Sequence, residues 1–472
     1  MYSAQTLTIL KAEARYTHRV KGKPVNQKSL KVTYMPNFAG ILYFLGTALR
    51  RLQWSKQKLK EYQEKRLRAV LRHAYDSVPL YHEKFRRAGV SPSDVKSLED
   101  LAKLPITRKD ELRQVDPLKL VSRHFRIEEL KVLRTSGSHG KPFRFYISHS
   151  EDDWRKSIYL RANISCGQHP RDRWVVITAP RHFSDTTNIQ RLLRIYAQRC
   201  ISVFDRVDEQ ARVIRKAKAD VLDGYSGALF LLAKETERQG IREIQPRLVF
   251  GSADLIDESS SKLIERVFNA PYYDQFGCAE VDRTAWQCPE KAGYHMDVDS
   301  VITQFVDSEG NEVSPGETGE IVYTSLFNFA MPFIRYSIED LGKPSDDVCQ
   351  CSRILPLMKV VEGRKDSLIV LPDGRLLSPR ILTVGMSMFE YYNSIEQFRI
   401  LQKKPDFFDV FLCVKENILD KEVLEKKLNM HFAKILGLPE QNVVFNVTIV
   451  EDFPVSKSGK LMSIISNVKP SS

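Results

Sequence analysis

The stretch Trp174-Val-Val-Ile-Thr178 begins the series of segments that decides the fold of this chain. It is a short apolar run bounded by charged and turn-forming residues, as expected of a buried strand. Strand-like and helix-like segments then alternate as far as Gly277. We predict strands at 174–178, 201–204, 221–225, 247–251 and 272–277, with helices at 209–218, 229–238 and 256–268. Such alternation predicts a sheet flanked by helices, with ligands bound at the strand ends and their loops.

Upstream of this series lies the loop-like stretch Thr135-Ser-Gly-Ser-His-Gly-Lys-Pro142. Its glycines and hydroxyl side chains allow backbone N–H groups and hydroxyls to close around phosphate oxygens, and Lys141 adds a positive charge. It differs from the common nucleotide P-loop, because proline follows the lysine and a strand-like alternation of Phe143, Phe145 and Ile147 comes next. The alternative is a plain Gly/Ser hairpin turn. The candidate phosphate-binding residues are Thr135, Ser136, Gly137, Ser138, Gly140 and Lys141.

Length and charge limit the classes of protein. A chain of 472 residues predicts two or three domains, and 42% apolar residues are enough for a substantial core. The net charge of +13 favours anionic partners, which include nucleotides, coenzyme A, acidic polymers and a membrane face. Seven cysteines without an evenly spaced framework indicate a reducing compartment, so we expect a cytoplasmic protein.

Residues 1–54 read as a basic N-terminal extension. Its apolar run from Phe38 to Leu49 is too short for a membrane-spanning helix, which needs about twenty residues. We expect a buried helix there, with peripheral membrane contact through the extension as the alternative. A helical pattern follows from Ser55 to Phe85 with a break at Pro79, and Ser150 is expected to cap a further helix with Asp153 in the capping-box position.

Downstream of the alternating series the sequence pattern changes. Short strands around turn residues after Val301 predict a β-meander, and from about residue 366 strands at 407–414 and 443–450 flank an amphipathic helix at 419–435. The predicted fold class is therefore α/β. We expect a large N-terminal α/β domain with layered sheets and a β-rich subdomain, followed by a smaller α+β C-terminal domain.

Four motifs with polar or charged residues lie at junctions of these elements. Each one alone is more often a turn, a surface salt bridge or a hairpin than a functional site. The segment from Arg335 brings a cation and two carboxylates to the end of a loop. The motifs are Phe276-Gly-Cys-Ala-Glu280, Arg335-Tyr-Ser-Ile-Glu-Asp340, Gly363-Arg-Lys-Asp366 and Pro454-Val-Ser-Lys-Ser-Gly-Lys460.

Taken together and in order with the phosphate loop, these motifs resemble the adenylate-forming enzymes, the superfamily of acyl-CoA synthetases and adenylation domains. The branch that the chain resembles most is that of phenylacetate–CoA ligase and the polysaccharide-associated CapK group. Val78-Pro-Leu-Tyr81, Leu98-Glu-Asp-Leu101 and Leu104-Pro-Ile106 look like the N-terminal signature of that branch. The resemblance covers roughly residues 55–470. It implies an AMP-binding domain at 55–365 and a mobile C-terminal domain at 366–472.

The resemblance also implies roles for single residues. The loop from Thr135 to Lys141 handles the ATP phosphates, and Phe276 with Gly277 lies beside the adenine. Glu280 is the Mg²⁺-linked carboxylate, and Asp340 binds the ribose. Arg364 contacts the nucleotide, Asp366 is the hinge of the C-terminal domain, and Lys460 contacts the acyl carboxylate during adenylation. The chemistry is coherent, since attack of a carboxylate on the α-phosphate accumulates charge that Mg²⁺ and lysine side chains offset.

Three positions depart from the pattern of the family. His139 stands where threonine is usual, Phe276 replaces the more usual tyrosine, and Asp254 follows the small residues where many relatives have glutamate. These departures bear on rate and substrate more than on the class of reaction.

Cys288, His295, Cys349 and Cys351 form a second constellation. Four ligands of these types suit a closed tetrahedral Zn²⁺ site, although the spacing is not one of the tight finger patterns. Members of the ligase branch look similar in having cysteine and histidine after the glutamate motif and a late Cys-x-Cys. The alternative is a set of ordinary buried thiols.

We therefore predict an ATP-dependent ligase that adenylates a small-molecule carboxylic acid and transfers the acyl group to coenzyme A. One alternative is an adenylate-forming ligase with an amine, carrier protein or cofactor as acceptor, and another is a non-catalytic nucleotide-binding module. Nucleic acid is not expected as a partner. The acyl pocket candidates lie near strand ends, where ordinary packing is an equal explanation, and they are Tyr225, Ser226, Gly251 and Tyr273.

Overall fold

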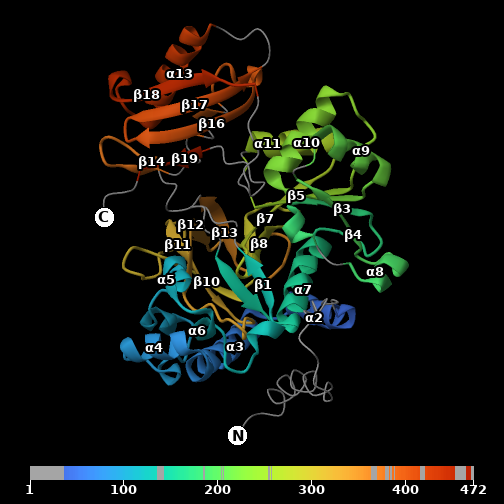
Figure 1. The fold of residues 1–472 in the computed structure, drawn as a ribbon, viewed down its shortest axis with the longest axis vertical. Helices are drawn as coiled ribbons and strands as arrows, with labels where there is room; N and C mark the ends of the chain where they lie inside the picture. The colour runs from blue at the N-terminus through green and yellow to red at the C-terminus, as the bar shows by residue number, and fades with distance from the viewer. Residues whose placement is uncertain are drawn as a thin grey trace, which may run out of the picture.

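The computed structural model shows a large body and a smaller C-terminal unit, drawn in orange and red at the top of Figure 1. The structure describes residues 37–134, 143–183, 186–203, 205, 207–253, 256, 258–362, 369–377, 382, 385–386, 388–414, 420–451 and 464–468.

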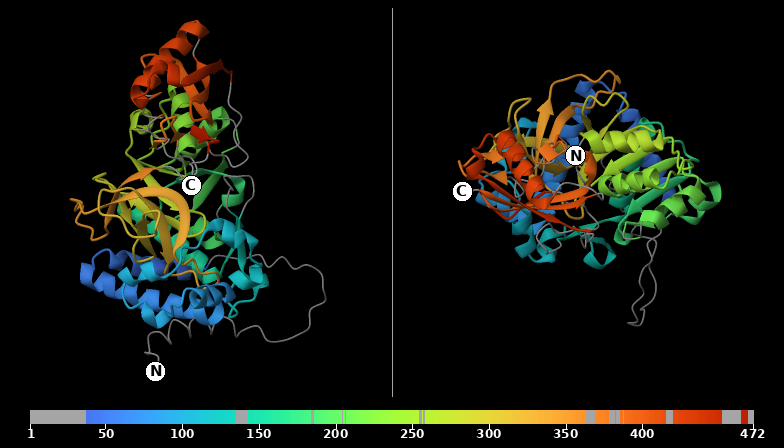
Figure 2. Two further views of the ribbon diagram at one scale, coloured as in Figure 1. Left: turned by 90° about the vertical axis from the view of Figure 1, so that its left-hand side faces the viewer. Right: turned by 90° about the horizontal axis from the view of Figure 1, so that it is seen from above.

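Helices form the lower part of the body, as the left view of Figure 2 shows. The helical pattern predicted after Ser55 is confirmed, and Ser55 caps the first helix by accepting a hydrogen bond from the backbone N–H of Lys58 at 3.2 Å. Pro79 occupies the first turn of the next helix, where its missing N–H leaves no hydrogen bond unmade. The helices are α2 (Phe38–Arg51), α3 (Lys56–Ser77), α4 (Pro79–Arg87), α5 (Lys109–Gln114) and α6 (Pro117–Leu120).

Helix α2 confirms the helix predicted within the N-terminal extension, and it packs into the body. Ile41 and Leu45 are buried in the main core, and α2 lies against α7 (His149–Ser165). At its end the Nε of the buried Arg51 lies 2.5 Å from a carboxylate oxygen of the buried Asp299. One side of α2 is thus part of the body's core, whereas Leu42 and Tyr43 remain exposed. Among the described helices, none is both long enough and apolar enough to cross a membrane.

One eleven-stranded sheet runs through the body in the order β10-β11-β12-β13-β9-β8-β7-β6-β5-β3-β4. The strands from β4 to β7 are parallel, which confirms the alternating series predicted from the sequence. They are β3 (Trp174–Thr178), β4 (Gln198–Ser202), β5 (Val221–Tyr225), β6 (Leu248–Ser252) and β7 (Tyr272–Cys278).

Each face of the parallel half has its own core. Helices α9 (Val207–Ala217), α10 (Ser226–Arg238) and α11 (Glu258–Phe268) cover one face through a cluster that includes Leu229 and Phe268. Helices α2 and α7 cover the other face. A sheet buried on both faces explains why its strands read as continuous apolar runs. Helix α8 (Asn188–Leu193) lies in the connection between β3 and β4.

The antiparallel half confirms the predicted β-meander and continues the same sheet. Strand β12 pairs with β11 on one side and with β13 on the other. The antiparallel strands are β8 (Asp282–Gln287), β9 (Tyr294–Met296), β10 (Val301–Val306), β11 (Gly319–Ser325), β12 (Tyr336–Ser345) and β13 (Leu357–Glu362).

A separate hairpin, β1 (Lys131–Arg134) with β2 (Arg144–Ile147), flanks the predicted phosphate loop, and residues 135–142 between these strands lie outside the described ranges. Helix α7 follows, but its cap differs from the prediction. Ser148 is the N-cap, and it forms a capping box with Glu151. Ser150 and Asp153 instead lie within the helix, because the Oγ of Ser148 accepts the backbone N–H of Glu151 at 3.3 Å while the carboxylate of Glu151 accepts the backbone N–H of Ser148.

The C-terminal unit confirms the predicted smaller α+β domain. Its four strands are ordered β18-β17-β16-β19, and α13 packs on them around a core that contains Phe408 and Phe432. A two-stranded ribbon, β14 (Ile369–Val370) with β15 (Leu376–Leu377), precedes this sheet. The other elements are β16 (Ile395–Lys404), β17 (Phe407–Val414), α13 (Lys421–Leu436), β18 (Val444–Ile449) and β19 (Ile464–Ser466).

Candidate active site and metal centre

The turn between β7 and β8 carries Glu280, and a glycine before it is required by close packing of the backbone. A Cβ atom on Gly277 would lie 2.1 Å from the carbonyl oxygen of Asp282. Any larger residue would therefore push the two strands apart. Phe276 pairs with Ala285 and Gly277 with Arg283, which leaves one extra residue in β8. This bulge lets the hairpin bend where Glu280 leaves it.

The side chain of Glu280 is almost fully buried, with 1% of its surface exposed, and it is held by two donors. The hydroxyl of Tyr336 donates a hydrogen bond to Oε1 at 2.6 Å, and the Nζ of Lys109 lies 3.1 Å from the same oxygen. Burial raises the pKa of the Glu280 carboxyl, but the charge of Lys109 and the hydrogen bond from Tyr336 outweigh burial and bring the pKa below its usual value. The buried carboxylate is therefore ionised at neutral pH.

Lys109 and Tyr336 are brought together by backbone pairing that the sequence did not predict. The N–H of Thr107 donates to the carbonyl oxygen of Arg335 at 2.7 Å, and the N–H of Ser337 donates to the carbonyl oxygen of Thr107 at 2.9 Å. This places the first residue of α5 beside the first residue of β12. Tyr336 lies within a motif that we had singled out, whereas nothing in the sequence around Lys109 distinguishes it from a surface lysine.

Arg155 connects Glu280 to the stem of the predicted phosphate loop. From α7 it donates to the carbonyl oxygens of Glu280 at 2.9 Å and Ala279 at 2.7 Å. Its guanidinium carbon also lies 5.8 Å from the ring centroid of Phe145 in β2. The hairpin that flanks residues 135–142 and the Glu280 turn are thus fixed to the same side chain.

Asp340 lies in a bulge of β12, near the end of β7. Glu320 pairs with Leu341 and Val322 with Ser337, so residues 338–340 face a single residue of β11. Burial raises the pKa of the Cys278 thiol, and the charges of Glu280 and Asp340 raise it further. The charges of Glu280 and Asp340 therefore both reach the Cys278 thiol, so the two predicted carboxylates both lie near the end of β7.

The cation expected from the same motif is not available there. The guanidinium of Arg335 is buried, and it donates hydrogen bonds to the carbonyl oxygens of Ala102 at 3.0 Å, Leu104 at 2.6 Å and Gly310 at 2.6 Å. The expectation that Arg335 offers its charge at the loop end is wrong, because these carbonyl groups engage its N–H donors. Lys109 is the cation that the structure places at this site.

Three of the four acyl-pocket candidates meet at the carboxyl ends of β5 and β6. Tyr225 is the last residue of β5, Ser226 follows it as the first residue of α10, and Gly251 lies in the neighbouring strand β6. A Cβ atom on Gly251 would lie 2.0 Å from the hydroxyl oxygen of Tyr272. The same oxygen lies within hydrogen-bond distance of the Oγ of Ser226, at 2.9 Å. The fourth candidate, Tyr273, belongs to the core on the other face of the sheet, and the structure does not bring it to the other three.

An aspartate next to this group was missed by the sequence analysis. The hydroxyl of Tyr294 donates to Oδ2 of Asp274 at 2.6 Å, and that of Tyr272 donates to Oδ1 at 3.3 Å. Burial raises the pKa of the Asp274 carboxyl to about 6. A lone acid inside an apolar strand carries no spacing signal, so only the fold could reveal it.

The remaining predicted site residues lie outside the described part of the chain. They are Thr135, Ser136, Gly137, Ser138, Gly140 and Lys141 of the phosphate loop, and Arg364, Asp366 and Lys460.

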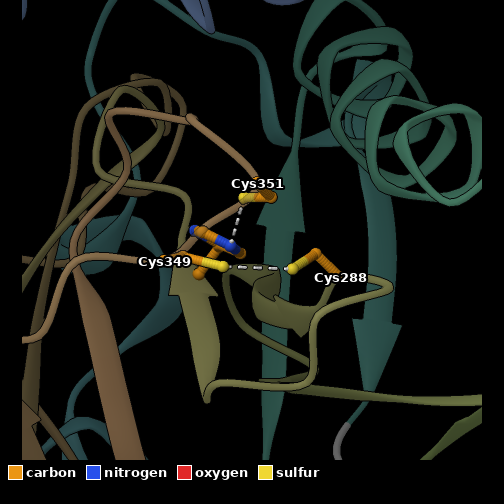
Figure 3. Close-up of side chains that lie close together, drawn as sticks. Cys288, Cys349 and Cys351 are labelled. Atoms are coloured by element: carbon orange, nitrogen blue, oxygen red, sulfur yellow. Dashed lines mark hydrogen bonds between the residues drawn. The ribbon is translucent and has the colours of Figure 1, made fainter.

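The four predicted metal ligands form one cluster. The ligand atoms of Cys288, His295, Cys349 and Cys351 all lie within 4.8 Å of one another. Figure 3 shows the three cysteine side chains directed toward a common point. The Sγ atoms of Cys288 and Cys349 are 3.5 Å apart, and the Sγ of Cys351 is 3.2 Å from the Nε2 of His295. A tetrahedral zinc with Zn–S bonds of about 2.3 Å separates its ligand atoms by about 3.5 to 3.8 Å.

The surroundings of His295 suit a metal ligand. Its Nδ1 lies 3.2 Å from the carbonyl oxygen of Leu355. That contact makes Nδ1 the protonated nitrogen and leaves the lone pair of Nε2 directed at the thiols. Burial lowers the pKa of the imidazole to about 4, so the ring is neutral, as coordination requires. The residues present therefore fit a zinc ion.

Comparison with known proteins finds relatives that are named as ligases. No protein-family model matches it. It is 29% identical over 331 residues to a phenylacetate-coenzyme A ligase of Pseudomonas putida, which covers 67% of this chain and 73% of that one. It is 22% identical over 426 residues to protein CapK of Staphylococcus aureus, covering 87% of this chain and 90% of CapK.

Among solved structures, the fold matches that of 2-hydroxyisobutyryl-CoA ligase in the postadenylation state, with a TM-score of 0.74 and 19% identity over 94% of this chain and 95% of that one. The predicted fold class is confirmed by this match. The sequence relatives confirm the predicted resemblance: the chain is similar to the phenylacetate–coenzyme A ligases and to CapK, and it shares the fold of a solved CoA ligase.

Proposed function

We propose that this chain is an AMP-forming ligase that activates a small carboxylic acid with ATP and passes the acyl group to coenzyme A. In the first step a carboxylate oxygen of the acid attacks the α-phosphorus of ATP, and the bond to pyrophosphate breaks. In the second step the sulfur of coenzyme A attacks the acyl carbon, its proton is lost to solvent, and AMP leaves. Relatives of this chain are named as coenzyme A ligases, which supports coenzyme A as the acceptor.

The observation that carries the proposal is the state of Glu280. A carboxylate held ionised in a buried turn, with Lys109 and Tyr336 on one oxygen, is suited to bind the cation of a metal–nucleotide complex. Glu280 would hold Mg²⁺, which when bound offsets negative charge on the phosphates. Asp340 would accept hydrogen bonds from the ribose hydroxyls. Phe276, with Gly277 beside it, would lie against the adenine.

The sequence assigns further steps to residues outside the described ranges. Thr135 to Lys141 would bind the phosphates, and Lys460 would stabilise the charge that develops as the carboxylate attacks. Arg364 would contact the nucleotide. The C-terminal domain would rotate about Asp366 between the two steps. These roles rest on the resemblance of the motifs.

Tyr225, Ser226 and Gly251 are the residues that we propose for the acyl end of the substrate. They lie at the carboxyl ends of parallel strands, where open α/β sheets bind ligands. Asp274 is paired with Gly251 in the neighbouring strand β7, and its hydrogen bond from Tyr272 would fix the position of the Tyr272 hydroxyl. We propose a structural role for zinc at the cluster of Cys288, since four protein ligands leave no open coordination position. A cytoplasmic location, where ATP and coenzyme A are supplied, belongs to the same proposal.

Pyrophosphate release across a library of carboxylic acids, measured with and without coenzyme A, tests the proposal. We expect one class of acid to give ATP-dependent release that coenzyme A accelerates, and Glu280→Gln to abolish it. Release that no acid stimulates in the folded, zinc-containing protein would count against a carboxylate-activating enzyme. Release with an acid that hydroxylamine accelerates and coenzyme A does not would keep adenylation and exclude coenzyme A as the acceptor.

A further inference from the structure

Helix α8, in the connection between β3 and β4, buries polar side chains and exposes apolar ones. Thr187 and Gln190 form a capping box, in which the N–H of Gln190 donates to the Oγ1 of Thr187 at 3.1 Å. Both of these polar residues are buried, at 8% exposure each. An ordinary surface helix buries its apolar side and exposes its polar side. Here the polar residues face the protein, so the apolar ones are turned to solvent.

The apolar residues of this segment form what we call the α8 patch, composed of Phe183, Ile189, Leu192 and Leu193. Their exposed fractions are 41%, 57%, 82% and 47%, and Leu192 is the most exposed of the large apolar side chains that the structure describes. Single exposed leucines are common on protein surfaces, but several large apolar side chains on one short segment mark an interaction site. Figure 1 shows α8 at the outer edge of the molecule.

Three arginines lie close to this patch along the chain. Arg191 and Arg194 lie in and directly after α8, and Arg199 follows in β4, which is an edge strand of the main sheet. All three are exposed, and none forms an ion pair with a described residue. Exposed arginines beside leucines and a phenylalanine combine the two attractions that hold proteins at an anionic lipid surface.

We propose that the α8 patch is a docking site for the surface of an anionic membrane. A second copy of this chain fits less well, because a symmetric contact through α8 would place Arg191 and Arg194 against arginines of equal charge. An anionic bilayer instead attracts these arginines while the four apolar side chains enter the headgroup region. The proposal concerns a different segment from the N-terminal extension, and it does not depend on which acid or acceptor the enzyme uses.

Co-sedimentation with lipid vesicles tests this docking in the full chain. We expect the wild type to bind vesicles of phosphatidylcholine mixed with phosphatidylglycerol, and to bind phosphatidylcholine vesicles much more weakly. Leu192→Glu should weaken binding to the mixed vesicles by about tenfold or more, since it removes apolar contact and adds repulsion. Arg191→Gln should weaken it roughly fivefold, as each arginine near an anionic surface contributes about this factor.

Matched variants separate the patch from general properties of the chain. Leu118→Glu changes a leucine that is also exposed, at 65%, on α6. Arg72→Gln removes an exposed charge from α3. Neither should change binding by more than about twofold, and the basic N-terminal extension is present in every variant. Pyrophosphate release in solution should be the same for Leu192→Glu and the wild type.

Two results would overturn the proposal. The first is a failure of the patch to account for vesicle binding: either the wild type does not bind vesicles, or Leu192→Glu and Leu118→Glu reduce binding equally. The second is light scattering that shows a wild-type dimer which Leu192→Glu converts to a monomer, because the occupant of the patch would then be a second copy of the chain.

Discussion

Replacing Lys109 with methionine would leave Glu280 buried without its positive partner. Lys109 and Glu280 are 13% and 1% exposed, so their contact at 3.1 Å belongs to the class of buried ion pairs. Removing one partner of such a pair costs about 3 to 5 kcal/mol, because the remaining charge is left uncompensated. Since the hydrogen bond from Tyr336 at 2.6 Å remains, we expect a loss near the lower end, about 3 kcal/mol.

The pH dependence of this loss identifies its cause. In the wild type the folded pKa of Glu280 lies below its ordinary 4.5, so its stabilising contribution is complete above that value and is lost as the pH falls through the folded pKa. In Lys109→Met, burial is opposed only by the hydrogen bonds from Tyr336 and from the backbone N–H of Glu280 itself, and we expect the folded pKa to rise above 4.5. The ionised form is then destabilising at neutral pH, and protonation relieves this as the pH falls. The difference between the two proteins should therefore shrink between about pH 7 and pH 4.

Urea denaturation at several pH values measures this difference, with the double variant Lys109→Met/Glu280→Gln completing a mutant cycle. The double variant should recover at least half of the stability that Lys109→Met loses, because no buried charge remains. Lys60→Met is the control: Lys60 pairs with Glu99 at 3.2 Å on the surface, and its loss should cost less than about 1 kcal/mol. A Lys109→Met loss below about 1 kcal/mol, or one that is equal at every pH, would refute the reasoning.

Three further predictions address the proposed chemistry. Lys460→Ala should lower adenylate formation by about a hundredfold or more and leave unfolding unchanged; equal pyrophosphate release in wild type and variant would contradict the role of Lys460. Asp366→Pro should retain adenylation while acyl transfer to coenzyme A collapses, and a parallel loss of both half-reactions would argue against a rotating domain. Cys349→Ser should lower zinc content and soluble yield together, whereas Cys200→Ser, at a thiol outside the cluster, should change neither. If the folded, active wild type contains under about one-tenth of a zinc per chain, the cluster consists of ordinary thiols.

The sequence predicted the features that depend on local pattern. The strands from Trp174 to Gly277 were recognisable because a sheet covered on both faces produces apolar runs between turns. The cluster of Cys288 with the late Cys-x-Cys was recognisable because soft ligands are few and their types are distinctive. Local pattern also misled in one place, since Ser148 rather than Ser150 caps α7.

Features that depend on long-range pairing could not be predicted from the sequence. Lys109 meets Glu280 only because Thr107 pairs with β12, and nothing near Lys109 in the sequence signals that pairing. Arg335 looked like a functional cation, but three distant carbonyl groups engage its guanidinium. Tyr272 rather than Tyr273 reaches Gly251, because neighbouring residues of a strand face opposite sides of the sheet. In each case the decisive partner comes from a remote segment.

The central claim, that this chain joins a carboxylate oxygen to the α-phosphorus of ATP, can be tested by following that oxygen. A substrate acid found in the pyrophosphate assay is labelled with heavy oxygen in its carboxylate and turned over with ATP and coenzyme A, and AMP is analysed by mass spectrometry. The account predicts that each AMP carries one heavy oxygen, and that Glu280→Gln forms almost no AMP. Heavy oxygen in inorganic phosphate with ADP as the nucleotide product, or AMP without heavy oxygen, would contradict it.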